Sequence, residues 1–226
     1  ESILTIQNNN KNKIIDFFKV QNPFSTSEAY KIKDIIEDRD KTKEDFYFIN
    51  TGTIDPYINL WGIKKTKYLK KVYQKPVIKK NILNKNFSNR FIQSSSKKII
   101  ITAMRYFETF YDQYGEYVAG KSTIIITNID KKYKLDALNI LLNSNFISKY
   151  INENYSSLGI DGGVNFNKDL INDLPLPNDF LKYQKRLSEY HNLLLKKLKL
   201  NEDICKLNNE INQYVRKIYN INNENF

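Results

Sequence analysis

Lys98-Ile99-Ile100-Ile101-Thr102-Ala103 and Ser122-Thr123-Ile124-Ile125-Ile126-Thr127 are the two stretches that decide the fold class. Both are rich in β-branched residues and bounded by polar residues or glycine, which is typical of β-strands. Each contains an unbroken triplet of isoleucines instead of an alternation of apolar and polar residues. We therefore predict that both strands lie in the interior of a sheet.

A helix and a further strand are predicted before these two strands. Ser25-Thr26-Ser27-Glu28 has the form of a capping box, and apolar residues then recur at helical spacing, which predicts a helix near 26–38. Phe46-Tyr47-Phe48-Ile49 is aromatic and β-branched and stops at Asn50-Thr51-Gly52. This pattern predicts a strand that enters a tight turn.

The apolar period changes after Lys134. Spacings of three and four residues over 135–151 predict two short helices that share one face. Pro175 and Pro177 mark a boundary, and the same spacing from Phe180 to Ile218 predicts a long helix or a helical hairpin bent near 199–201. We favour packing of its apolar stripe against the preceding domain over a free coiled-coil dimer. The expected class is α+β, with a mixed β-sheet domain over 1–177, flanking helices, and a helical arm over 178–226.

The charge of the chain is confined to one segment. Between Pro56 and Phe107 there is no Asp or Glu, whereas the same stretch holds eleven Lys and two Arg. This gives +13 against a total of +11, so the rest of the chain carries −2. Because codon usage in an AT-rich genome favours acids as well as lysine, the confinement indicates a surface that neutralises a polyanion, in preference to a merely solvated basic face.

The composition also limits the chemistry of the chain. The single cysteine, Cys205, excludes an internal disulfide, and with the single histidine, His191, it cannot build a Cys/His zinc site. There is no apolar run long enough to cross a bilayer and no signal-peptide pattern, so we expect no membrane partner and a reducing cytoplasm. The chain begins at Glu1 instead of Met, and we expect a piece of a longer protein.

No catalytic site is expected in this chain. The glycine-rich turn that holds the cofactor of a methyltransferase is missing, as is the Asn/Asp-Pro-Pro-aromatic cluster that binds a flipped adenine. The loop over 159–163 lacks the context of a phosphate-binding loop. Glu108 and Asp112 are four residues apart and can share a helical face, where solvent-exposed charge is the favoured interpretation. For His191 a structural role is favoured over a catalytic one.

Binding chemistry is concentrated in the strip from Trp61 to Tyr68. This strip interleaves aromatic residues with cations and so offers phosphate contacts together with a stacking or apolar surface. Asn residues in the predicted loops can read adenine edges, although most Asn residues are ordinary loop residues.

Several strings of residues resemble a known family. Those at 48–57, Trp61-Gly62 and 64–69 resemble the region downstream of the catalytic domain in type II adenine-specific DNA methyltransferases, including fused endonuclease-methyltransferases. The later half resembles the TaqI-like C-terminal specificity domain, through 97–101, Tyr111-Asp112, Gly115, Ser122-Thr123, 141–144 and 174–177. The ending, 207–211 with Val215 and Ile218-Tyr219, resembles the terminal helix of such enzymes. The resemblance covers residues 25–220.

This resemblance implies a target-recognition domain over 1–177 that reads a short sequence of double-stranded DNA for a methyltransferase catalytic domain. That catalytic domain would lie in cis or in trans and would bind S-adenosylmethionine, and no cofactor is expected in the present chain. The arm over 178–226 would pack on the recognition domain or on the partner domain.

Ten residues are the candidate DNA contacts. The expected phosphate contacts are Lys64, Lys65, Lys67, Arg90, Arg105 and Lys121. The expected base readers, from loops or strand edges, are Tyr68, Ser122, Asn165 and Asn167. Two alternatives stay open: half of a type I restriction specificity subunit, and a divergent metal-dependent nuclease.

Overall fold

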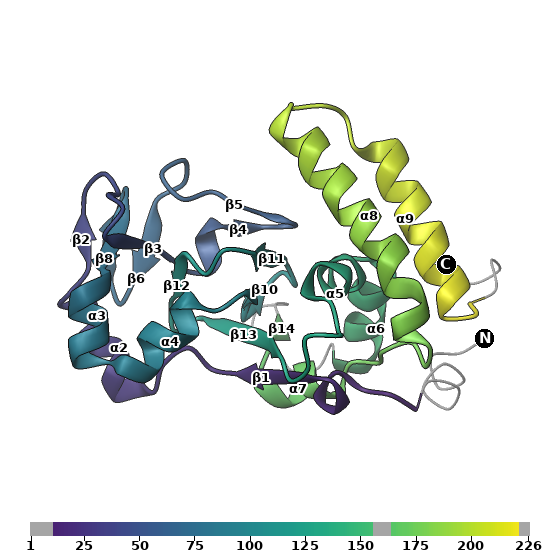
Figure 1. Ribbon diagram of the computed structural model, residues 1–226, viewed down its shortest axis with the longest axis horizontal. Coiled ribbons are helices and arrows are strands. Elements are labelled where there is room, and N and C mark those ends of the chain that lie inside the picture. The colour runs from purple at the N-terminus through teal and green to yellow at the C-terminus, as the bar shows by residue number, and fades with distance from the viewer. Residues whose placement is uncertain (1–10, 156–163, 222–226) are drawn as a thin grey trace. The chain divides into compact units, whose positions relative to one another are not determined.

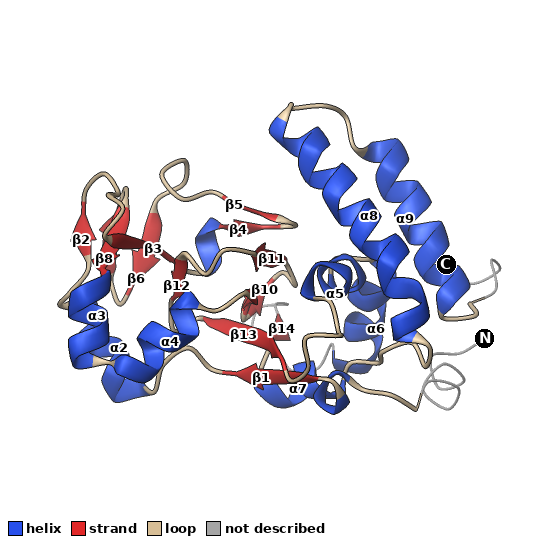
Figure 2. Cartoon of the chain, viewed as in Figure 1, coloured by secondary structure: helices blue, strands red, loops and turns tan. Residues whose placement is uncertain are grey.

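The computed structural model describes residues 11–155 and 164–221 and has a mixed α+β fold (Figures 1 and 2). The chain divides into two compact units. The sheet unit comprises 20–127 and 165–168, and the helical unit comprises the remaining described residues. Side chains of residues 105, 164 and 165 are not described.

The first sheet contains both isoleucine strands. Its order is β1 (Phe18–Gln21), β13 (Thr123–Asn128), β9 (Lys98–Thr102) and β11 (Thr109–Asp112). β9 runs antiparallel to both β13 and β11. The two strands therefore lie in the interior of the sheet, as predicted, and their isoleucines are buried.

A second sheet of the sheet unit contains the predicted aromatic strand. Its order is β12 (Tyr117–Ala119), β3 (Asp45–Ile49), β8 (Pro76–Lys79) and β2 (Glu37–Asp38). β12 is parallel to β3, whereas β8 is antiparallel to both β3 and β2. A core cluster that includes Ile49 and Ala119 from this sheet and Ile100 and Ile125 from the first sheet joins the two.

Short helices and ribbons complete the sheet unit. The helices are α2 (Thr26–Lys33), α3 (Lys80–Asn86), α4 (Ser88–Ser95) and the 3-10 turn η2 (Thr51–Thr53). The two-stranded ribbons pair β4 (Ile54–Asp55) with β5 (Ile58–Asn59), β6 (Thr66–Tyr68) with β7 (Lys71–Tyr73), and β10 (Met104–Arg105) with β14 (Val164–Asn165).

The capping box predicts the start of α2 correctly but not its end. The Ser25 hydroxyl accepts a hydrogen bond from the Glu28 amide, and the Glu28 carboxylate accepts one from the Ser25 amide. The expected end near residue 38 is wrong, because the helix stops at Lys33 and residues 37–38 pair with β8 as strand β2.

An ion pair lies in the interior of the sheet unit between neighbouring strands. Lys98 of β9 and Asp112 of β11 are direct partners in the strand register, and both side chains are almost fully buried. The Lys98 ammonium also donates to the carbonyls of Ser94, at 2.7 Å, and Ser96, at 3.2 Å. Burial lowers the pKa of Lys98, and the Asp112 carboxylate opposes that effect. The expected helical face for Asp112 is therefore wrong.

The helical unit contains the two predicted short helices and the predicted hairpin. Its elements are the 3-10 turn η1 (Ile14–Asp16), α5 (Leu135–Leu142), α6 (Asn145–Tyr155), α7 (Lys168–Asp173), α8 (Phe180–Lys199) and α9 (Cys205–Ile218). The hairpin turns where expected, and Asn201 has a positive φ of 52°. None of the described helices has the length and apolar composition needed to cross a bilayer.

The division into two units separates the chain after residues 19 and 127, and residues 165–168 belong to the sheet unit. Residues 128–155 group with α8 and α9, and α5 packs directly on α8. The segment around the two prolines is held within the helical unit, since the Tyr219 hydroxyl donates to the Pro175 carbonyl at 2.9 Å and the Leu176 amide donates to Asn12.

His191, for which the sequence favours a structural role, is buried in the helical unit. It lies on α8 with 1% of its surface exposed, and its Nε2 atom lies 3.2 Å from the side-chain nitrogen of Asn139 on α5. Burial lowers its pKa to about 4, which keeps the imidazole neutral in the fold.

Because the folded pKa of His191 is below its ordinary value of 6.5, its stabilising contribution is complete above that pH and is lost as the pH falls toward 4. We expect the wild-type free energy of unfolding to fall by up to about 3 kcal/mol across this window. The His191→Gln variant should show a shallower fall in urea titrations followed by circular dichroism. Since His191 is the only histidine in the chain, identical pH profiles for the two proteins would contradict this assignment.

Candidate nucleic-acid interface

Part of the charge in the acid-free segment is neutralised in the folded sheet unit. Of its twelve cations whose side chains the structure describes, five form ion pairs with acids that come from outside the segment. These pairs are Lys64–Asp55, Lys75–Asp40, Lys79–Glu37, Arg90–Glu28 and Lys98–Asp112. The charge that remains available to a ligand is therefore localised at fewer positions than the sequence indicates.

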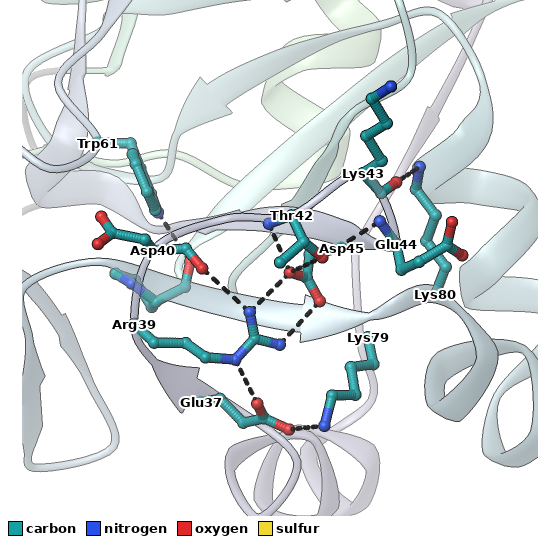
Figure 3. Close-up of polar contacts among 11 residues, drawn as sticks. Glu37, Arg39, Asp40, Thr42, Lys43, Glu44, Asp45, Trp61, Lys79 and Lys80 are labelled. Carbon is teal, nitrogen blue, oxygen red and sulfur yellow. Dashed lines mark hydrogen bonds and ion pairs between the residues drawn. The ribbon is translucent and has the colours of Figure 1, made fainter.

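At one edge of the second sheet four charged side chains form a connected set of ion pairs, Glu37, Arg39, Asp45 and Lys79, as Figure 3 shows. The Arg39 guanidinium donates two hydrogen bonds to the buried Asp45 carboxylate, at 2.7 and 2.9 Å, and a third to Glu37 at 2.6 Å. The amide and hydroxyl of Thr42 also donate to Asp45. These donors hold the pKa of Asp45 far below its usual range, with Arg39 as the largest cause. The adjoining hollow of about 750 Å³ is lined by residues of both signs.

A second hollow of the sheet unit has a different character. It has a volume of about 830 Å³ and is lined by four lysines but only two acids. We call it the lysine groove, and its lining residues are Asn50, Thr51, Gly52, Ile54, Asp55, Lys64, Lys65, Lys67, Tyr68, Leu69, Lys70, Met104, Tyr106, Glu108 and Ser122. Lys64 pairs with Asp55 at 3.2 Å. Lys65, Lys67 and Lys70 are exposed and form no ion pair within the described residues.

The β6–β7 hairpin presents these lysines. Tyr68 pairs with Lys71 in its register, so Leu69 and Lys70 form the two-residue turn. Both have left-handed backbone angles, with φ of 44° and 66°, as a type I′ turn requires. Neither residue is glycine, and this conformation strains L-residues. Leu69 packs on the hydrophobic core of the second sheet, which holds the turn in place.

Asn50 joins two sides of the lysine groove. Its side-chain nitrogen donates to the Lys67 carbonyl at 2.8 Å, and its side-chain oxygen accepts from the Ser122 amide at 3.3 Å. The neighbouring Thr51 hydroxyl donates to the Ser122 carbonyl. Gly120 is required here, because a Cβ at that position would lie 2.6 Å from the Asn50 side-chain oxygen.

Part of the groove is apolar and acidic. Met104 is 48% exposed and Tyr106 is 72% exposed, although both line a groove with four lysines. Glu108 is half-buried, and burial raises the pKa of its carboxyl, with a further contribution from Asp55 that Lys64 opposes.

The structure brings together five of the ten candidate contacts. Lys64, Lys65, Lys67, Tyr68 and Ser122 all line the lysine groove. The Ser122 hydroxyl is half-exposed and has no hydrogen-bond partner among the described residues. Tyr68 is 3% exposed and its hydroxyl donates to the Ala29 carbonyl at 3.1 Å, so it forms the floor of the groove.

The other candidates lie apart from the groove or beside it. Arg90 of α4 makes two hydrogen bonds to Glu28, at 2.8 and 3.1 Å, and Lys121 donates to the Thr26 hydroxyl. Arg105 belongs to β10, together with Met104 of the groove, and Asn165 belongs to β14, which pairs with β10. Asn167 follows β14 and is exposed.

The exposed aromatic side chain in the lysine groove is not Trp61, the residue that the sequence indicates. Trp61 packs edge-on against Tyr47, with ring centres 4.8 Å apart, and its indole donates to the Pro76 carbonyl at 2.7 Å. It therefore belongs to the packing of the sheet unit, whereas Tyr106 is the exposed aromatic of the groove. Sequence reasoning also missed Asn50, Lys70 and Glu108 as groove residues.

The loop over 159–163 lies outside the described residues. Among residues 11–155 and 164–221, no three His, Cys, Asp or Glu side chains are grouped so that they could hold a metal ion.

The similarities of this chain to known proteins are distant and come from structure alone. No protein-family profile matches the chain, and no curated protein sequence matches it. Among solved structures, the chain is similar to the Type IIL restriction-modification enzyme MmeI in complex with DNA, with 9% sequence identity and a TM-score of 0.48. The match covers 93% of this chain but only 32% of that enzyme's chain.

The strained turn at the groove leads to a stability prediction. Lys70→Gly should raise the free energy of unfolding by about 1 kcal/mol, because glycine adopts a left-handed φ without a Cβ clash. Lys67→Gly, in the extended strand β6 of the same hairpin, should lower it by about 0.5–1 kcal/mol. Urea titration of both variants tests the difference. A destabilised Lys70→Gly variant would show that the turn is not strained as described.

Proposed function

We propose that this chain binds double-stranded DNA through the lysine groove and serves as a target-recognition module of a restriction-modification enzyme. The observation that carries the proposal is the position of the unpaired lysines. Acids neutralise five other cations of the segment, whereas Lys65, Lys67 and Lys70 line one groove and form no ion pair with any described residue. Clustered, unneutralised lysines attract a polyanion and release its counterions on binding.

The composition of the groove favours nucleic acid over a small anion. Lys65 precedes strand β6, Lys67 lies within it, and Lys70 lies in the turn after it, so the three charges are distributed along the hairpin and the residue before it. The same groove exposes Met104 and Tyr106, which give it an apolar surface beside the cations. This combination suits a ligand with phosphates on its outside and bases within reach.

The finer part of the proposal concerns the enzyme that the module serves. The strings at 48–57 and 64–69, which resemble adenine-specific DNA methyltransferases, supply residues to the lysine groove, including Asn50 and Lys67. We infer that the module directs methylation of adenine by a catalytic domain, in cis or in trans, that binds S-adenosylmethionine.

The groove predicts how single lysines contribute to binding. Lys65→Ala and Lys67→Ala should each weaken binding to all duplex sequences alike, and each should lower the slope of log affinity against log salt by about one unit. Lys85→Ala is the matched control, since Lys85 is an exposed lysine of the same acid-free segment that lies outside the groove. Fluorescence anisotropy between about 50 and 200 mM salt measures the slopes. Equal effects of all three substitutions would remove the groove from the proposal.

The adenine-specific role predicts a change in the methylation of cellular DNA. Deleting the coding segment of this chain from the source organism should abolish N6-methyladenine at one short sequence, because the catalytic domain would lose its target recognition. Methylome sequencing of the deletion strain and of a complemented strain measures this. An unchanged methylome would contradict the adenine-specific assignment while leaving DNA binding by the groove intact.

A further inference from the structure

The segment 104–108 forms a side of the lysine groove that phosphate binding does not explain. It supplies Met104, Tyr106 and Glu108 to the lining. Two of these side chains are exposed and apolar in part, and the third is a carboxylate, which repels a phosphate. Neither property helps to neutralise a polyanion, so the segment needs another explanation.

The backbone of this segment is held rigidly at its base. Thr102, which is 1% exposed, donates its hydroxyl to the Tyr106 carbonyl and accepts a hydrogen bond from the Glu108 amide at 3.1 Å. The Thr102 amide donates to the Glu108 carbonyl, and the Tyr106 amide donates to the Met104 carbonyl, both at 3.0 Å. The Phe107 ring packs on Phe166 with ring centres 5.2 Å apart. Tyr106 is thus presented outward from a fixed turn, which reduces the entropy lost when it contacts a ligand.

The exposed part of the segment suits the apolar surfaces of nucleic acid. Tyr106 has 72% of its surface exposed and lies in the same groove as three lysines that have no ion pair. In a polyanion held by those lysines, the bases are the component that offers planar or apolar surface, including thymine methyl groups.

Glu108 has the chemistry of an acceptor that lacks a donor. Its carboxylate is half-buried and forms no hydrogen bond or ion pair within the described residues. Burial of an unpaired carboxylate is unfavourable, and a donor from a bound ligand would relieve that cost. In double-stranded DNA the donors in the major groove are the exocyclic amines of cytosine and adenine.

We propose that the segment 104–108 is the base-contacting side of the lysine groove, where Tyr106 packs against bases and Glu108 accepts a hydrogen bond from an exocyclic amine. This proposal rests on the proposed function, since it requires DNA in the groove. In this proposal the segment determines which DNA sequence is preferred, and the lysines contact the phosphates of the DNA backbone.

The test uses the 226-residue chain and a randomised duplex DNA library. Tyr106→Ala should weaken binding about tenfold at every salt concentration without changing the salt slope, and Tyr106→Phe should retain the wild-type affinity. Glu108→Gln should change the selected sequences at one base pair, because an amide also donates hydrogen bonds. The controls are Tyr114→Ala, an equally exposed tyrosine outside the groove, and Glu44→Gln, an exposed acid outside it.

The outcomes separate the two proposals. Loss of affinity for Tyr106→Ala with an unchanged slope, together with an altered preference for Glu108→Gln and wild-type behaviour of both controls, supports the inference. Wild-type behaviour of the Tyr106 and Glu108 variants overturns it, and the proposed function stands if Lys65→Ala and Lys67→Ala still lower the slope. A lower slope for Tyr106→Ala also overturns it, since the tyrosine would then act through the lysines. If the lysine variants also behave as wild type, both proposals fall.

Discussion

The buried pair of Lys98 and Asp112 is the constraint on which the sheet unit depends. Asp112 accepts hydrogen bonds from the amides of Glu116 and Tyr117, so the same carboxylate that fixes the β9–β11 register also directs the chain into β12 of the other sheet. Lys98 donates to the carbonyl of Ser94 in the last turn of α4 and to that of Ser96, which follows the helix. The turn between Asp112 and β12 requires glycine at position 115, because a Cβ there would lie 2.1 Å from the Ser95 carbonyl oxygen. Removal of either charge would leave the other buried without compensation, which typically costs about 3–5 kcal/mol.

The lysine groove is built on this fixed frame. Asn50 lies at the end of β3, a neighbour of β12 in the second sheet, and reaches both Lys67 and Ser122. Its position therefore connects the sheet that the ion pair orients with the hairpin that carries the lysines. Ion pairs neutralise four cations of the segment that lie away from the groove, Lys75, Lys79, Arg90 and Lys98, whereas Lys65, Lys67 and Lys70 line one hollow and form no ion pair with the described residues. Their positive field therefore acts together at the groove.

A structural feature could be predicted from the sequence where the residues that determine it are close together along the chain. The isoleucine strands and the capping box of α2 are local patterns, and the structure confirms them. The sequence favours an exposed Asp112, because no residue near it in the sequence indicates that its partner is Lys98 on the neighbouring strand. For the lysines, the count of charges could not show which acids would pair with them. The burial of Tyr68 could have been predicted from the sequence. Side chains alternate along a strand, so Thr66 and Tyr68 share the buried face and Lys67 lies on the exposed face.

The separation between frame and groove has an evolutionary consequence. Residues of the groove that face solvent, such as Lys70 and Tyr106, lie in short turns that are anchored by the partly buried Leu69 in one case and by the buried Thr102 in the other. Substitutions at the tips of these turns leave the buried groups unchanged, so most of them are tolerated by the fold. Mutations can therefore accumulate at the tips while the core sequence is conserved, and related chains could diverge in what they bind long before they diverge in how they fold.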